Sequence, residues 1–163
     1  VDVIVNAANS ALAGGGGVDG AIHAAAGPSV MSELRERYDG CPTGSAVITD
    51  GGDLPAPFIV HAVGPIWRGG DAGEADSLAG AHAASLDRAA EIGANSVAFS
   101  ALSCGVYGYP LEQAAEVSLR AVQAWLSTHP DGHPEDIMWV LRGTPVMAAF
   151  RGALAALQEG TAE

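Results

Sequence analysis

The sequence predicts an α/β fold in which helices pack in layers against a central sheet. Strand-like runs alternate with longer helix-like stretches along the whole chain, and this alternation is typical of layered α/β domains. The run 57–63 is almost continuously apolar, as expected for a strand that is covered on both faces. A length of 163 residues suits one domain with a sizeable core, so residues 1–163 are expected to form a single domain.

Each element has a signal of its own. The apolar run Val3-Ile4-Val5 marks the first strand, and Pro55 and Pro57 bracket the start of the third. Apolar residues recur at helical spacing over 111–125, directly after Pro110, which favours a helix start there. The expected strands cover residues 1–6, 45–50, 57–63, 96–102 and 137–142, and the expected helices cover 18–26, 29–38, 75–92, 111–128 and 145–158.

Charge and composition exclude several classes of function. The net charge is −12 with only seven Lys and Arg residues, whereas nonspecific binding to nucleic acid needs clustered basic residues. No run of about 18 apolar residues and no signal-peptide pattern occurs, so neither a membrane span nor secretion is expected. Cys41 and Cys104 stand far apart without further ligands. They indicate a reducing compartment such as the cytoplasm, and no metal site.

The loop after the first strand carries most of the functional information. The strand leads into Asn6 and Asn9, four glycines follow at 14–17, and Asp19 stands at the start of a helix-like segment. Glycine runs let backbone N–H groups approach a ligand closely, and a helix N-terminus favours negative charge. The segment therefore predicts a seat for a phosphate or diphosphate, with Asp19 beside it as a candidate for chemistry.

A second loop of the same kind follows the fourth strand. Residues 103–110 read Ser-Cys-Gly-Val-Tyr-Gly-Tyr-Pro and end at a helix start. Ligand sites in α/β sheets gather at the carboxyl ends of strands. If the first and fourth strands are neighbours, both loops converge on one cleft, and two loops lined by N–H groups suit a diphosphate better than a single phosphate.

Several of these residues also have a purely structural interpretation. Acids such as Asp19 are common in the first helical turn, where they offset the helix dipole. Asn9 has the alternative role of stabilising the turn by a side-chain bond to the backbone, and Asn6 is expected to hold the loop in this way. His23, one turn after Asp19, and His61, inside the third strand, are expected to be packed structural histidines.

Two residues of the second loop also have two alternative interpretations each. Tyr107 is either an exposed loop aromatic or a platform for a sugar or base. Cys104 is either a small loop residue or, because it precedes Gly105 and a helix, a thiol of lowered pKa.

Taken together, these motifs resemble a macrodomain of the bacterial MacroD type, a family of ADP-ribose hydrolases also described as O-acetyl-ADP-ribose deacetylases. The resemblance implies a three-layer α/β/α fold around a mixed sheet, with ADP-ribose over the strand ends. The family's usual first strand and its Gly-Asp-Ile segment do not precede Asn6, so that N-terminal strand is expected to be missing. The matching stretches are residues 1–10 (VDVIVNAANS), 14–23 (GGGGVDGAIH), 41–44 (CPTG), 61–67 (HAVGPIW) and 105–110 (GVYGYP).

The resemblance also implies roles for individual residues. Asp19 would be the catalytic carboxylate, and Asn9 would hold a hydroxyl of the distal ribose beside it. Tyr107 would pack near that ribose. Neither a metal nor another cofactor is implied. The implied ligand-binding residues are Asn9, Gly15, Gly16, Gly17, Val18 and Asp19 in the first loop, and Ser103, Cys104, Gly105, Val106, Tyr107 and Gly108 in the second.

The implied activity is hydrolysis of an ester on the distal ribose of ADP-ribose. The expected substrates are O-acetyl-ADP-ribose and proteins that carry mono-ADP-ribose on Asp or Glu. Two alternatives stay open: a reader module that binds ADP-ribose without cleaving it, and an enzyme that removes ADP-ribose from nucleic-acid ends. The net charge of −12 disfavours the second alternative.

Overall fold

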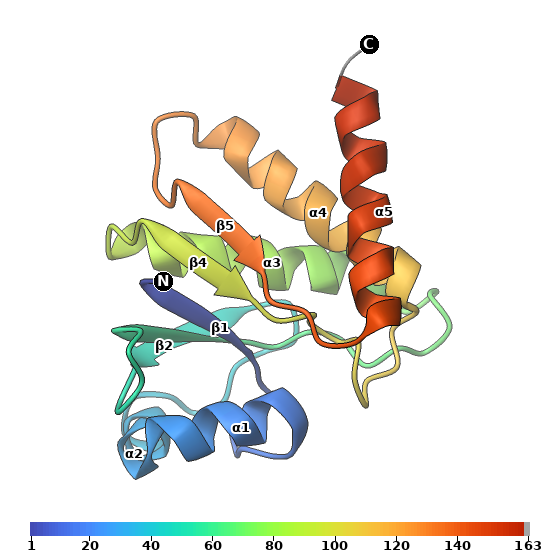
Figure 1. Ribbon diagram of the computed structural model, residues 1–163. Helices are drawn as coiled ribbons and strands as arrows, with labels where there is room; N and C mark the ends of the chain where they lie inside the picture. Colours follow the sequence, from blue (N-terminus) through green and yellow to red (C-terminus); the bar gives the residue numbers. More distant parts are fainter. Residues whose placement is uncertain (162–163) are drawn as a thin grey trace.

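A computed structural model describes residues 1–161 as a five-stranded mixed sheet with helices on both of its faces (Figure 1). The strands are β1 (Val3–Ala7), β2 (Ala46–Asp50), β3 (Phe58–Ala62), β4 (Ser96–Phe99) and β5 (Asp136–Trp139). The helices are α1 (Gly17–Ala26), α2 (Pro28–Arg37), α3 (Glu74–Glu91), α4 (Leu111–Thr128) and α5 (Thr144–Thr161). The strand order is β2-β3-β1-β4-β5, and only β2 runs antiparallel to its neighbour. The expected α/β/α class and mixed sheet are confirmed.

The hydrophobic core lies on both sides of the sheet, which explains the apolar third strand. Ile59 packs with α1 and α2 residues, whereas Val60, the next residue, packs with residues of α3 and α4. Both side chains are fully buried, because successive side chains of a strand point to opposite faces. Figure 1 shows α1 and α2 on one side of the sheet, and α3 and α4 lie on the other side.

The fourth and fifth strands end earlier than the apolar pattern predicted. β4 stops at Phe99 because the chain then turns. Cys104 N–H donates to the Ala101 carbonyl, and Ser103 takes a left-handed φ of 66°. Leu102 is nevertheless buried, so its apolar character reflects core packing and not strand pairing. The strand expected over 137–142 likewise covers only 136–139.

The expected stripe of α4 is buried as predicted at most of its positions. Ala114, Ala115, Val122 and Trp125 are buried. Ser118 is also buried, and its hydroxyl donates to the Ala114 carbonyl at 2.6 Å, which satisfies the polar group within the helix. α5 packs against α4 and extends beyond the sheet (Figure 1). No helix among residues 1–161 has the length and apolar character needed to cross a bilayer.

Candidate active site

The sheet brings the two glycine loops to one edge. β1 and β4 are parallel neighbours, with Val3 opposite Val97 and Val5 opposite Phe99. Parallel strands end at the same edge of a sheet, so the loops that follow β1 and β4 leave it side by side. The Ser100 hydroxyl donates to the Val5 carbonyl at 3.1 Å and ties the start of the second loop to β1. The sequence had predicted convergence only on the condition that these strands are neighbours, and they are.

Asn9 fixes the shape of the first loop. Its side-chain amide donates to the Gly14 carbonyl at 2.9 Å, and its side-chain carbonyl accepts from the Ala13 N–H at 3.1 Å. The chain also needs left-handed backbone at Leu12 and Gly14, with φ of 54° and 79°. The structural interpretation of Asn9 is therefore confirmed. One amide proton and one lone pair of Asn9 have no partner within residues 1–161 and can serve a ligand.

Backbone amides without an internal partner line both loops. Within residues 1–161, the N–H groups of 14–19 and of 105–107 donate to no backbone or side-chain acceptor. Gly16, the N-cap of α1, supplies no side-chain cap to the first turn. An uncapped helix N-terminus that follows a glycine run leaves several donors and the positive end of the helix dipole for an anion.

The second loop is held in a strained conformation by its neighbours. Ser103 is a buried, non-glycine residue at positive φ, a conformation that costs about 1 kcal/mol or more and clusters at functional sites. A Cβ at Gly64 would overlap the Ser103 hydroxyl, so the segment after β3 touches this turn. The Tyr107 carbonyl accepts from the Trp67 N–H at 2.8 Å. Val106 is fully exposed and Tyr107 half-buried.

Asp19 lies beside the first loop and is largely buried. Only 8% of the residue is exposed, and a Cβ placed on Gly15 would lie 3.5 Å from its Oδ2 atom. Its Oδ1 atom accepts from the Asn6 side-chain amide at 2.7 Å and lies 3.4 Å from Nε2 of His23. The prediction that Asn6 bonds to the loop backbone is wrong: as a β1 residue it faces α1, so it reaches the Asp19 carboxylate.

His61 belongs to the same buried cluster, which its strand alone did not reveal. Its Nδ1 atom lies 3.2 Å from the Asn6 amide nitrogen, and its Nε2 atom lies 2.9 Å from the Thr49 hydroxyl. Burial, together with the nearby His23, lowers the pKa of His61 to about 3. The only signal in the sequence was a histidine inside an otherwise apolar strand; the contact with Asn6 depends on the pairing of β1 with β3.

Cys104 is not an activated thiol. Burial raises its pKa from 9.0 to about 11. The possibility of a lowered pKa is thus overturned, because the desolvation of the thiolate outweighs any favourable dipole. Cys104 is a loop residue whose side chain packs against the core.

Glu74 is a site-supporting residue that the sequence did not single out. Its carboxylate accepts from the N–H groups of Arg68, Gly70 and Ala72 at 2.7–2.9 Å, and these bonds lower its pKa to about 2. It thereby fixes the segment after Trp67, the residue that donates to the second glycine loop.

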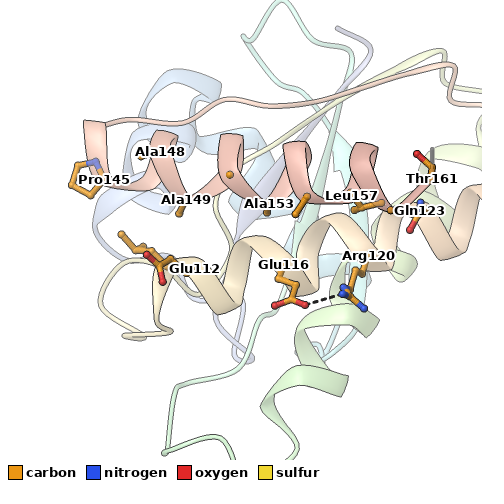
Figure 2. Close-up of a pocket in the computed structure, with 14 residues that line it drawn as sticks. Glu112, Glu116, Arg120, Gln123, Pro145, Ala148, Ala149, Ala153, Leu157 and Thr161 are labelled. Atoms are coloured by element: carbon orange, nitrogen blue, oxygen red, sulfur yellow. Dashed lines mark ion pairs between the residues drawn. The ribbon is translucent and has the colours of Figure 1, made fainter. Parts of the chain in front are cut away.

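A separate groove lies away from the two glycine loops. It runs between α4 and α5, is lined by small residues of α5 and by Glu112, Glu116 and Arg120 of α4, and contains no residue of either glycine loop (Figure 2). Glu116 and Arg120 form an exposed ion pair there at 3.0 Å. Among residues 1–161, no group of three or more His, Cys, Asp or Glu side chains has the geometry of a metal site.

The arrangement combines two functions at one edge of the sheet. Free amides offer hydrogen bonds to a polyanion without any basic side chain, and the carboxylate of Asp19 stands next to them. A carboxylate in hydrogen-bond reach of a water molecule is able to orient that water or take its proton. The site therefore suits hydrolysis of a bond in a ligand whose diphosphate occupies the loops.

Comparisons with known proteins agree with this assignment. The sequence model described as Macro domain matches residues 5–118. A protein of Klebsiella pneumoniae (strain 342) named O-acetyl-ADP-ribose deacetylase is 50% identical over 159 residues, 95% of this chain and 89% of that protein. A point mutant of the Oceanobacillus iheyensis macrodomain with ADPR superposes with a TM-score of 0.89 at 36% identity, covering 97% of this chain and 87% of that one. The same macrodomain with ADP gives 0.88 at 37% identity, covering 98% and 85%. The chain belongs to the Macro domain family.

Proposed function

We propose that this chain binds ADP-ribose at the two glycine loops and hydrolyses the ester of O-acetyl-ADP-ribose. The single observation that carries the proposal is the buried carboxylate of Asp19 next to the unpaired amides of residues 14–19. The name of the Klebsiella relative and the ADPR in the related macrodomain support the same ligand and reaction.

In this proposal the two loops bind and the two polar side chains of the first loop direct the reaction. The N–H groups of Gly15 to Asp19 and of Gly105 to Tyr107 hold the diphosphate, with Ser103, Cys104 and Gly108 shaping the second loop. Asn9, already fixed by two bonds within its loop, presents its remaining proton or lone pair to a hydroxyl of the distal ribose. It contributes orientation, not proton transfer.

Asp19 acts on the attacking water. The water oxygen forms a bond to the acyl carbon while Asp19 accepts one of its protons. The bond between the acyl carbon and the ribose oxygen then breaks, and the ribose oxygen takes the proton that Asp19 holds. Acetic acid leaves and ionises to acetate. Because the carboxylate is tethered by Asn6 at 2.7 Å, its direction is set before the substrate binds.

A second ester substrate is mono-ADP-ribose on Asp or Glu of a protein, since both substrates carry an ester on the distal ribose of the same ADP-ribose moiety. We also propose that the chain forms a single domain and works in a reducing compartment such as the cytoplasm, which its two free cysteines fit. A reader that binds ADP-ribose without hydrolysis remains the competing function, and the fate of the ester separates the two.

The test compares turnover with binding in Asp19→Ala. Mass spectrometry of O-acetyl-ADP-ribose should show turnover by the wild-type protein and a loss of roughly 10²–10⁴-fold in the variant, the range for a removed acid–base group. Calorimetry should show that ADP-ribose still binds. Asp131→Ala, an exposed loop change, serves as the control with wild-type turnover. Hydrolysis by Asp19→Ala at the wild-type rate would refute the role, and a wild-type protein that only binds would establish the reader.

A further inference from the structure

A row of buried polar groups connects β2 to the Asp19 carboxylate. It runs from the Asp50 carbonyl through the Thr49 hydroxyl, the His61 imidazole and the Asn6 amide, with successive distances of 3.0, 2.9, 3.2 and 2.7 Å. Thr49, His61 and Asn6 are each at most 1% exposed. We call this row the buried polar chain. It crosses three neighbouring strands on the sheet face that α1 covers.

The Asp19 carboxylate, at one end of the buried polar chain, determines which group donates and which accepts in every hydrogen bond of the row. An ionised carboxylate only accepts, so the Asn6 amide must turn its nitrogen toward Asp19. The second proton of that nitrogen then faces Nδ1 of His61, which therefore has to accept. The imidazole proton consequently resides on Nε2, and this N–H donates a hydrogen bond to the Thr49 hydroxyl. The Thr49 hydroxyl in turn donates a hydrogen bond to the Asp50 carbonyl.

The charge state of His61 fits this direction. Burial and the nearby His23 keep the imidazole neutral, with a pKa of about 3. A protonated ring would place an N–H against the Asn6 amide protons and break the row. A neutral ring of the opposite tautomer would do the same, so only one of the three protonation states of His61 supports the Asn6 bond to Asp19.

The buried polar chain lies within an apolar layer, where polar groups lose their hydration and so reduce the stability of the fold. Burial of a polar group is unfavourable unless the group forms a hydrogen bond. The row links its members by hydrogen bonds, but the buried Asn6 Oδ1 atom has no partner among residues 1–161, so only the amide nitrogen of Asn6 is held. Among residues 1–161, the outer partners Thr49 and His61 form no hydrogen bond with either glycine loop. What they fix is the direction of the Asn6 amide, which would otherwise rotate about its side chain.

We propose that Thr49 and His61 are positioning residues that hold the Asn6 amide, and through it the Asp19 carboxylate, in the orientation that ester hydrolysis requires. The inference rests on the proposed function of Asp19. It predicts that a change at Thr49, on a strand that carries no loop residue of the site, lowers kcat while leaving ligand binding intact.

The test uses the matched pair Thr49→Val and Thr49→Ser. Valine has the shape of threonine but accepts no hydrogen bond, whereas serine keeps the hydroxyl. Thr49→Val should lower kcat for O-acetyl-ADP-ribose roughly tenfold, since misplacing a reacting group by about 1 Å costs up to a hundredfold. Its KM and its Kd for ADP-ribose should stay at wild-type values, and Thr49→Ser should restore kcat. In an Asn6→Ala background, Thr49→Val should have no further effect on kcat.

A direct readout complements the kinetics and does not depend on the stability of any variant. Nitrogen-15 NMR of the histidine-labelled wild-type chain at neutral pH should show His61 as the neutral Nε2–H tautomer. An Nδ1–H tautomer, or wild-type kcat in Thr49→Val, would overturn the inference while leaving the function of Asp19 intact. A wild-type chain that binds ADP-ribose but hydrolyses no ester would instead overturn the proposed function, and the inference with it.

Discussion

A second buried histidine makes the stability of the fold sensitive to mild acid. His82 of α3 is fully buried against the rings of Phe99 and Trp139. Its Nδ1 atom donates to the Leu78 carbonyl at 2.8 Å. Burial lowers its pKa from 6.5 to about 4, because the charged ring would lose its hydration. Between pH 6.5 and pH 4, His82 is therefore neutral in the folded chain but protonated in the unfolded chain.

The size of the effect follows from the two pKa values. The histidine contributes its full stability above pH 6.5, and this contribution is lost as the pH falls toward 4. Protonation stabilises the unfolded state by about 2 kcal/mol at pH 5 and by far less than 1 kcal/mol at pH 7. The folded state gains almost nothing over the same range. His82 alone should therefore cost the fold about 2 kcal/mol between pH 7 and pH 5.

The assay compares urea unfolding of the wild-type chain and His82→Leu at pH 7 and pH 5 at constant ionic strength. The difference in free energy of unfolding between the two should shift by about 2 kcal/mol in favour of the variant at pH 5. Leu86→Ala, equally buried in α3 but without a titrating group, should show the same difference at both pH values. A pH-independent difference for His82→Leu would refute the assignment of a neutral, buried ring.

Two further predictions concern the second glycine loop. Gly64→Ala places a Cβ on the Ser103 hydroxyl and should weaken ADP-ribose binding roughly tenfold or more by displacing the turn, as measured by calorimetry; Gly152→Ala, where the Cβ meets open space, should bind normally. In a Cys41→Ser background, Cys104 should react with iodoacetamide at pH 8 about a hundredfold more slowly than a thiol of pKa 9.0, because its pKa of about 11 leaves far less thiolate. Intact-mass labelling at the rate of an unperturbed thiol would contradict the burial argument.

Local patterns in the sequence were sufficient for the elements and the loops. The alternation of apolar runs predicted every strand and helix to within a few residues, because side-chain periodicity is a local property of the backbone. The glycines at 14–17 and the helix start after them predicted amides without partners, which residues 1–161 show. The predicted strand over 96–102 is longer than the observed β4. The reason is that Leu102 is an apolar residue buried in the core, outside the strand.

The tertiary structure decided which residues act together. Strand order is not written in any local pattern, so only the fold places β1 between β3 and β4. That order brings Asn6 against His61 and directs it away from its own loop. Burial, also a property of the assembled layers, raises the pKa of Cys104 and lowers that of His61. The sequence by itself determined a glycine loop at a helix start with an acid beside it. Contacts between distant segments determined how that acid is held, because such contacts depend on packing across the sheet.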